Sequence, residues 1–525
     1  MKLTSVVKSL IKAPFYALAM VIFGLGLSAV IRLTNFLVHL VLGAEHGDAS
    51  DVITLVAKHL PIALGILGFL SAFISVDMTT SVFGTARWAN SHELKQVTAG
   101  DEGLLIGRDP TTGQLLRYDG PAHLLTMAPT RTGKGVGTVL PNLLTADRSI
   151  ICIDPKGENA QVAGSARERF GPVHVLDPFE VTGQKSSAYN PLDVIEADGL
   201  DVAEDASTLA DALVYDEPGT GGEAHWNEEA KALIAGLILK IVVAESPGRR
   251  HLGTLREYLT LAPERFLVLM ARMQEMDEAN GLIARTANRH LGKSEREAAG
   301  VLSAAQRHTH FLDSQRMTAV LSRSEFGFAD LKRRSVSIFL VLPPDRLSTY
   351  ARWLRLLVSQ SLAAMARERA IPRRPVLYLL DEFAALGHLA PVERAMGLMA
   401  GYGVQLWPIL QDIHQLRSTY GRRSGTFLSN AAVLQVFGVN DIETAELIAR
   451  TIGKADVNYS TRSFSKGVTS RAEHIAARDL INADEILRLS PSKMILLRQG
   501  QLPAVASKIR YFEDKEFAGS FPAAP

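Results

Sequence analysis

The sequence is poor in cysteine and has almost no net charge. Cys152 is its only cysteine among 525 residues, so an intrachain disulfide is excluded and a reducing compartment is favoured. The 56 basic and 55 acidic side chains give a net charge of +1, which excludes a global positive field for attracting nucleic acid. Any nucleic-acid contact must therefore be local. Cys152 lies in the apolar run Ser149–Asp154, where we expect a buried core side chain.

Internal repeats and long low-complexity tracts are also absent, but two long apolar runs are present at residues 13–31 and 60–76. Each is close to the ~20 residues that span a bilayer. The first run lacks a small-residue cleavage site and a second run follows it, which disfavours a cleaved signal peptide. We therefore expect a transmembrane domain with two spans over residues 1–76.

The charges around these runs predict their orientation. Three lysines precede the first run and three acidic residues lie between the runs: Lys2, Lys8 and Lys12, then Glu45, Asp48 and Asp51. Because basic residues accumulate on the cytoplasmic side of a membrane, both chain ends should be cytoplasmic. The rest of the chain, from about residue 77, is expected to be soluble.

Residues 127–137 are typical of a phosphate-binding loop. The apolar run His123–Met127 precedes the loop and a helical pattern from Val136 follows it. Backbone N–H groups and a helix N-terminus can therefore converge on phosphate oxygens, and Lys134 can supply a positive charge. We assign nucleotide binding to nine consecutive residues: Ala128, Pro129, Thr130, Arg131, Thr132, Gly133, Lys134, Gly135 and Val136.

The loop departs from the usual pattern G-x-x-x-x-G-K-[ST] at Ala128 and at Gly135. Gly135 has no hydroxyl to offer a Mg²⁺ ion. Thr132, Thr138 or a water molecule must take its place.

A second site motif follows the apolar segment Val376–Leu380. Asp381 at the end of this strand can hold Mg²⁺ through its water shell, and Glu382 can orient and deprotonate a water molecule that attacks the γ-phosphate. Gln411 closes another apolar strand, Val404–Leu410, where its neutral amide can contact phosphate or the attacking water. A polar residue that merely ends a strand is the alternative for Gln411.

The chain after residue 121 alternates strand and helix patterns, which predicts an α/β domain with an open, mostly parallel sheet. Eight strands are expected: His123–Met127, Ser149–Asp154, Val173–Leu176, Val336–Leu342, Val376–Leu380, Gln405–Leu410, Val433–Gly438 and Met494–Arg498.

Residues 197–322 break this alternation, since they are helical in pattern throughout. Their clearest helices are Trp226–Ala244, Glu264–Glu278 and Glu295–Ala305. We expect an inserted all-α subdomain here. It separates residues 77–196, a connector and the first part of the nucleotide-binding domain, from residues 323–525, the second part. His308 and His310 within it could bind a metal or could simply lie at a solvated helix end.

Several ordered motifs together resemble one family. They are Thr85–Ala89, the loop Ala128–Gly135, Asp154–Glu158, Tyr189–Asp193, Asp381–Phe383, Leu410–Leu416, Phe437–Asp441 and Arg498–Asp514. This combination, with the two amino-terminal apolar runs, resembles the coupling proteins of type IV secretion and conjugation, the TraG/TraD family. The resemblance covers most of the chain, and Gly-Lys-Gly recurs in that family at the position of Gly135.

The resemblance implies a RecA-like P-loop ATPase that forms a hexamer on the bacterial inner membrane and uses ATP and Mg²⁺. Its partners would be a relaxase bound to single-stranded DNA, secreted effector proteins, or both, and the components of a type IV secretion channel. The all-α subdomain would select this cargo. By position, Lys134 binds phosphate, Asp381 holds magnesium, Glu382 activates water and Gln411 senses the γ-phosphate.

A hexameric ATPase of this type usually needs an arginine from the neighbouring subunit. The candidates are Arg417, Arg422 and Arg423. Asp154 and Lys156 end another strand at the predicted ligand edge, although an ordinary turn explains them almost as well.

Other classes of protein fit the sequence less well. A dinucleotide-binding domain has the spacing G-x-G-x-x-G, which differs from the glycine spacing at Gly133, Gly135 and Gly137. An ABC transporter would carry its signature motif between the two nucleotide motifs. A chromosomal translocase of the FtsK type would carry a long linker and a terminal winged helix. A membrane receptor that binds nucleotide without hydrolysis is disfavoured by the intact pair Asp381 and Glu382.

Overall fold

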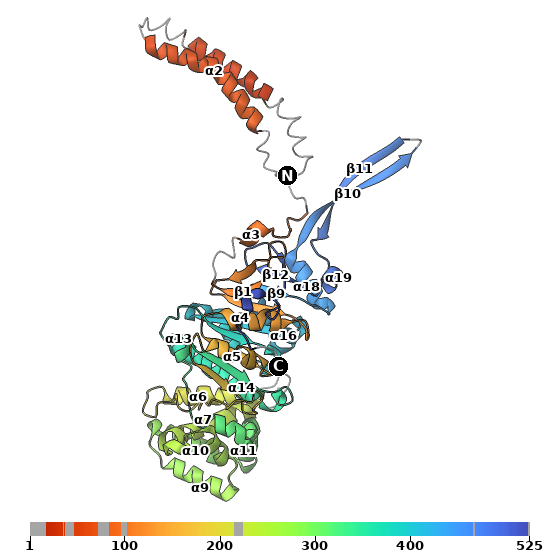
Figure 1. The fold of residues 1–525 in the computed structure, drawn as a ribbon. Helices are drawn as coiled ribbons and strands as arrows, with labels where there is room; N and C mark the ends of the chain where they lie inside the picture. The colour runs from red at the N-terminus through yellow and green to blue at the C-terminus, as the bar shows by residue number, and fades with distance from the viewer. Residues whose placement is uncertain are drawn as a thin grey trace. The chain divides into compact units, whose positions relative to one another are not determined.

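The computed structural model divides the chain into two compact units, residues Met1–Val82 and Phe83–Pro525 (Figure 1). It describes residues 17–34, 36, 47–71, 83–95, 102–214, 224–465 and 468–522. The outer parts of the two predicted spans, residues 13–16 and 72–76, lie outside this range.

The described residues of the first unit include two helices, of which one is long and apolar enough to cross a membrane. That helix is Ala17–Thr34. The helix α2 (Gly47–Ser71) contains a shorter apolar stretch, Ile53–Leu67. One of the two predicted spans thus corresponds to a helix with the length and composition of a membrane span, and the prediction of two spans is not confirmed.

Small residues bring these two helices into close contact. The Ser28 hydroxyl donates a hydrogen bond to the carbonyl oxygen of Ala57 over 2.5 Å. A Cβ on Gly24 would lie 2.7 Å from the Cα of Pro61, and one on Gly65 would lie 2.6 Å from the side chain of Val21. Small residues of this kind let helix backbones approach each other in an apolar surrounding.

The second unit is built on an eleven-stranded sheet with the order β2-β1-β13-β12-β9-β3-β8-β7-β4-β6-β5. The seven strands from β9 to β5 are parallel, and the other four add antiparallel pairs at one side. Their bounds are β1 Leu104–Arg108, β2 Leu115–Tyr118, β3 His123–Met127, β4 Ile150–Asp154, β5 Val173–Leu176, β6 Ser337–Val341, β7 Val376–Leu380, β8 Val404–Leu410, β9 Ala431–Val436, β12 Lys493–Arg498 and β13 Ala504–Ser507.

Both faces of this sheet are buried. Along β4, Ile151 and Ile153 belong to one apolar core, while Ile150 and Cys152 belong to the core on the opposite face. Strands covered on both faces are continuously apolar, which is why they stand out in the sequence. All eight predicted strands are confirmed, with bounds that shift by up to two residues, and the buried position of Cys152 is confirmed as well.

Helices cover the two faces. Those that surround the sheet are α3 Ser91–Lys95, α4 Leu140–Thr145, α5 Glu158–Arg167, α14 Leu347–Arg367, α15 Ala390–Leu398, α16 Ile413–Tyr420, α17 Ser424–Asn430, α18 Ile442–Ile452 and α19 Ala483–Leu487. Several begin at side-chain caps that are visible in the sequence. Asp412 accepts from the N–H of Gln415, and Asp441 accepts from the N–H of Thr444.

The described residues between β5 and β6 form helices and turns, in agreement with the predicted helical pattern. The helices are α6 Val202–Leu213, α7 Ala224–Ala244, α8 Leu252–Leu259, α9 Pro263–Gln274, α10 Leu282–Leu291, α11 Glu295–Thr309, α12 Gln315–Val320 and α13 Asp330–Arg333. Figure 1 shows most of them gathered at one end of the second unit.

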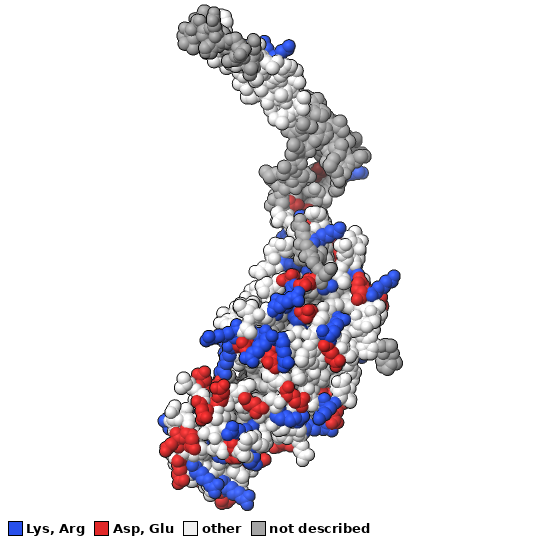
Figure 2. All heavy atoms as spheres, turned by 60° about the vertical axis from the view of Figure 1, so that its left-hand side comes forward, with Lys and Arg blue, Asp and Glu red and all other residues white. Residues whose placement is uncertain are grey.

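A long hairpin extends from the other end of this unit (Figure 1). Its strands are β10 (Lys454–Ser465) and β11 (Val468–Asp479), which pair along their whole length. This hairpin was not among the predicted strands, because most of its described side chains are exposed and only the short stretch Ala455–Tyr459 alternates apolar and polar residues. The surface of the second unit carries interspersed basic and acidic side chains on the face shown in Figure 2, as the near-zero net charge requires.

Candidate functional site

Three neighbouring parallel strands place the predicted site residues at one edge of the sheet. The loop follows β3, Gln411 follows β8, and Asp381 follows β7. In the sheet β8 lies between β3 and β7. The carboxyl ends of these strands therefore meet, as expected for a ligand site of an open α/β sheet.

The loop after β3 has a constrained backbone. The N–H of Ala128 bonds to the carbonyl of Leu410 over 2.8 Å, which ties the loop to β8. Arg131 has a φ of 64° and Gly133 a φ of 94°. A positive φ is unusual for arginine and marks a strained turn of the kind found at ligand sites. The helix that follows starts as a π-helical segment, Gly135–Val139.

Lys134 meets both predicted carboxylates. Its Nζ lies 3.2 Å from Oδ1 of Asp381 and 2.9 Å from Oε2 of Glu382. Lys134 and Asp381 are each 14% exposed at the side chain, while Glu382 is 33% exposed. The ammonium thus lies between the two acids, where it balances their charge.

The local environment shifts the pKa values of two of these groups. Burial lowers the pKa of Lys134, but the charges of Asp381 and Glu382 outweigh burial and leave that pKa above its ordinary value. Burial raises the pKa of the Asp381 carboxyl, which the nearby Lys134 only partly offsets. Perturbed groups that converge in this way are typical of functional sites.

Glu382 and Gln411 face each other. Glu382 has a left-handed backbone with a φ of 56°, held by the short helix Phe383–Leu386 that follows it. The Nε2 of Gln411 lies 3.5 Å from Oε1 of Glu382, and the N–H of Gln411 donates to the side chain of Gln415 over 2.8 Å. The side-chain amide of Gln411 and the carboxylate of Glu382 therefore lie next to each other.

The structure narrows the choice of a hydroxyl for a metal ion. Thr138 is fully buried and its hydroxyl lies 3.4 Å from the side-chain oxygen of Gln435, which disfavours a metal contact for this residue. Thr132 donates its hydroxyl hydrogen bond to the carbonyl of Pro129 over 2.6 Å. Thr132 and a water molecule therefore stay the preferred substitutes.

Asp154 and Lys156, at the end of β4, differ from each other in burial. Asp154 is buried, and its carboxylate accepts a hydrogen bond from the N–H of Ala160 in α5 over 2.8 Å. Burial raises the pKa of Asp154 to about 6, and the neighbouring charge of Asp381 contributes to this rise. Lys156 is exposed. Asp154 thus stabilises the start of a helix beside the site.

The three candidates for an arginine that reaches a neighbouring subunit differ in their ion pairs. Arg417 forms an ion pair with Glu443, and Arg423 forms one with Glu393 over 3.1 Å. Arg422 is exposed and forms no ion pair with any residue that the structure describes. Within the same range, no group of three or more metal-binding side chains gathers. His308 instead contacts Asn227 at 2.8 Å in the core, and His310 faces Asp313 at 2.9 Å.

A family model described as type IV secretory system conjugative DNA transfer matches residues 87–522. The chain belongs to this family. Similar relatives include a conjugal transfer protein TraG from Escherichia coli, which is 29% identical over 78% of this chain and 72% of the relative. The protein VirD4 from Rhizobium radiobacter is 29% identical over 82% of this chain and 64% of the relative. The chain thus spans about two thirds of the length of that relative.

Solved structures of the coupling protein TrwB share the fold of this family member. TrwB in complex with ADP and Mg²⁺ superposes with a TM-score of 0.62 at 18% identity, over 82% of this chain and 94% of the other. The sulphate complex of TrwB gives a TM-score of 0.63 at 18% identity, over 84% of this chain and 98% of the other. These structures confirm the α/β architecture that the sequence predicted.

Proposed function

We propose that this chain is a membrane-anchored, Mg²⁺-dependent ATPase that couples cargo to a type IV secretion channel. The observation that supports the proposal most strongly is the contact of Lys134 with both Asp381 and Glu382 at the edge of the sheet. A lysine after β3 and two carboxylates after β7, which meet at one edge of the sheet, form an arrangement suited to ATP hydrolysis. The relatives TraG and VirD4 and the fold of TrwB add support from family membership.

Each residue has a defined role in this proposal. Lys134 leaves the carboxylates and binds the β- and γ-phosphates, while the N–H groups of the loop hold the remaining phosphate oxygens. Glu382 accepts the proton of the water molecule that attacks the γ-phosphate in line with the leaving group. Gln411, which faces Glu382, orients that water and contacts the γ-phosphate.

The residues at the site fit a Mg²⁺ ion. Asp381 offers carboxylate oxygens, which Mg²⁺ prefers, and the absence of a hydroxyl at Gly135 leaves room for ordered water molecules. When bound, the ion neutralises charge that develops on the phosphates. Asp381 would hold it through water.

The cargo and the assembly also belong to the proposal. Residues 197–322 select a relaxase bound to single-stranded DNA, effector proteins, or both, and deliver them to the channel. Residues 1–76 anchor the chain in the bacterial inner membrane as a two-pass domain, with both termini and the ATPase domain in the cytoplasm. The apolar helix Ala17–Thr34 and its close contacts with α2 support this hairpin.

The catalytic role of Glu382 is tested with the substitution Glu382→Gln in the full chain. Removing the base should lower kcat for ATP hydrolysis at least about 100-fold, while ATP affinity is retained because Lys134 and the loop are intact. The exposed Glu325, which pairs with Arg323, provides the matched control Glu325→Gln. Undiminished hydrolysis by Glu382→Gln would contradict the role, and no hydrolysis by the parent chain would favour a non-hydrolysing receptor.

We also propose that the chain forms a homohexamer in which Arg422 reaches the site of the neighbouring subunit. Its exposure and its lack of an ion pair among the described residues support this choice over Arg417 and Arg423. Arg422→Ala should lower kcat at least about 100-fold. Mixing Arg422→Ala subunits with Glu382→Gln subunits should restore part of the activity, because some interfaces then combine both intact residues. No recovery on mixing would argue against action between subunits.

A further inference from the structure

The phosphate-binding loop is braced by the chain segment that follows β13. The Nζ of Lys508 donates a hydrogen bond to the carbonyl oxygen of Thr132 over 2.7 Å. The same ammonium lies 4.8 Å from the centre of the Phe437 ring. In the next residue, the carbonyl oxygen of Ile509 packs so closely that a Cβ on Gly137 would lie 2.9 Å away. This segment thus contacts both the loop and the helix that follows it.

A second segment, Phe437–Gly438, packs against the side chain of Thr132. Gly438, directly after Phe437, has a φ of 65°, and a Cβ there would lie 2.4 Å from Cγ2 of Thr132. Phe437 itself bonds through its N–H to the carbonyl of Met127 over 3.2 Å. Thr132 is therefore held at its side chain by the end of β9 and at its carbonyl by Lys508.

The contact with the carbonyl sets the direction of a neighbouring donor. In a trans peptide the C=O and the following N–H point in opposite directions, and the described residues contain no cis peptide bond. When Lys508 holds the Thr132 carbonyl, the N–H of Gly133 must point away from Lys508. Gly133, with a φ of 94°, lacks the steric restraint that would otherwise keep this peptide from turning over.

We propose that Lys508 is a positioning residue of the nucleotide site, which fixes the peptide between Thr132 and Gly133 so that the Gly133 N–H is ready to bind a phosphate oxygen. This inference rests on the proposed ATPase function. Lys508 is itself anchored through its backbone N–H, which bonds to the carbonyl of Ser492 over 2.8 Å. Its contact is made to the loop backbone, away from the carboxylates of Asp381 and Glu382.

Replacing Lys508 should weaken the affinity for nucleotide and leave the rate of ATP hydrolysis at saturation unchanged. In Lys508→Met the apolar stem remains but the charged donor is gone, so part of the binding free energy is spent on ordering the loop. The Kd for ADP and the KM for ATP should each rise about tenfold. The kcat at saturating ATP should stay within about twofold, because an interaction lost equally in the ground and transition states leaves kcat unchanged.

The experiment uses the full chain in detergent with a fluorescent ADP derivative as the probe, together with steady-state hydrolysis. Lys508→Arg keeps a charged donor and should restore most of the affinity. Lys493 is the matched control, because its Nζ donates to the hydroxyl of Ser507 over 3.0 Å on the same pair of strands without a contact to the loop. Lys493→Met should bind ADP as the parent does.

Two results would overturn the inference. One is a folded Lys508→Met variant whose affinity for ADP is unchanged; the other is an equal loss of affinity in Lys493→Met, which would indicate a general weakening of the strands. If Lys508→Met does not fold, Lys508→Gln is compared with Lys508→Arg, and equal affinities overturn it. A parent chain that does not bind ADP would instead refute the proposed function itself.

Discussion

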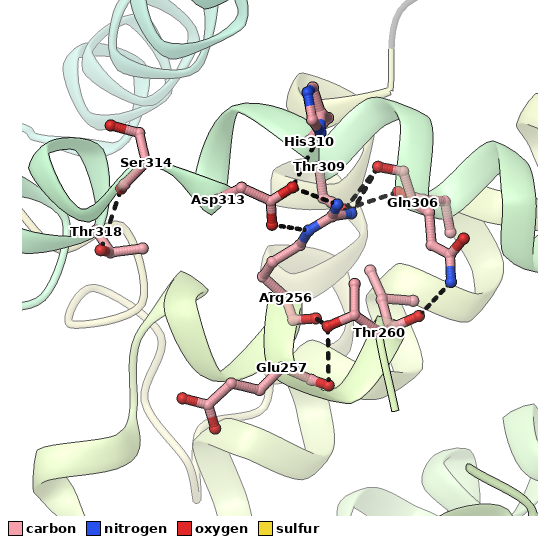
Figure 3. A network of polar contacts seen from close by, with 11 residues as sticks. Arg256, Glu257, Thr260, Gln306, Thr309, His310, Asp313, Ser314 and Thr318 are labelled. Atoms are coloured by element: carbon pink, nitrogen blue, oxygen red, sulfur yellow. Dashed lines mark hydrogen bonds and ion pairs between the residues drawn. The ribbon is translucent and has the colours of Figure 1, made fainter. Parts of the chain in front are cut away.

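The proposed nucleotide site and the helical region both bring a cation together with carboxylates, but they satisfy the charges in different ways. In the helical region, Arg256 of α8 binds both carboxylate oxygens of Asp313, at 2.6 and 2.7 Å (Figure 3). A third nitrogen of Arg256 donates to the carbonyl of Gln306 and to the hydroxyl of Thr309. The chain itself thus supplies each of these partners.

Lys134 differs because ATP hydrolysis would use its partners for other roles: Asp381 would hold Mg²⁺ and Glu382 would activate water. Asp381 and Glu382 share one ammonium at the open edge of the sheet. A bound phosphate would draw that ammonium away, and a bound cation would replace it beside the acids. A charge whose partners are permanent stabilises a fold, whereas a charge whose partners can be exchanged for a ligand indicates a binding site.

The largest effect that separates the two regions should come from Lys134→Ala. The affinity for ATP should fall at least about 100-fold, because the loop loses its charge for the phosphates. Titration of the full chain with a fluorescent ATP analogue measures this loss. The exposed Lys185 provides the control Lys185→Ala, and equal affinities in both variants would remove Lys134 from the site.

A smaller effect, on stability alone, is expected from Arg256→Ala. Breaking this network removes the charged donor from the carbonyl of Gln306 and from the carboxylate of Asp313, which should lower the free energy of unfolding by about 2 kcal/mol. The KM for ATP should not change. Chemical denaturation and hydrolysis assays check both outcomes, and a raised KM would mean that the helical region is coupled to the site. His310, 70% exposed beside the same Asp313, gives the control His310→Ala, with a change within about 0.5 kcal/mol.

The smallest effect is expected from replacing Asp154, a buried carboxylate that lies beside the proposed site and holds the start of α5. Because burial raises its folded-state pKa to about 6, its contribution to stability is fully present below the ordinary pKa of an aspartate and is lost as the pH rises through about 6. Asp154→Asn should reduce this loss of stability with rising pH and make the chain about 1 kcal/mol more stable at pH 7.

Thermal unfolding without nucleotide at several pH values between 4 and 8 tests this prediction. The exposed Asp198 supplies the control Asp198→Asn, which should follow the parent at every pH. A lower stability of Asp154→Asn at pH 7 would mean that the charged carboxylate is needed to hold the N–H of Ala160 and the start of α5.

The sequence predicted the sheet well because its central strands are buried on both faces. Strands such as Ile150–Asp154 and Val376–Leu380 are almost entirely apolar, and the carboxylates Asp381 and Glu382 directly after the second strand could be assigned to the site. The hairpin Lys454–Asp479 was missed for the opposite reason, since most of its described side chains are exposed and its hydrophobic period is limited to Ala455–Tyr459. The burial of Thr138 could not be predicted, because its spacing from Lys134 does not reveal that the helix turns it into the core toward Gln435.

The sequence by itself determined which chemical groups this protein has and in what order: a phosphate-binding loop with Lys134, a strand that ends in Asp381 and Glu382, and a strand that ends before Gln411. Such motifs are local, so hydrophobic pattern and residue type are enough to find them. The tertiary structure decided which of them meet. Lys134 and Glu382 are 248 positions apart, and Lys508 reaches Thr132 across 376 positions. Contacts over such separations depend on the order of strands in the sheet, which the packing of the whole domain sets.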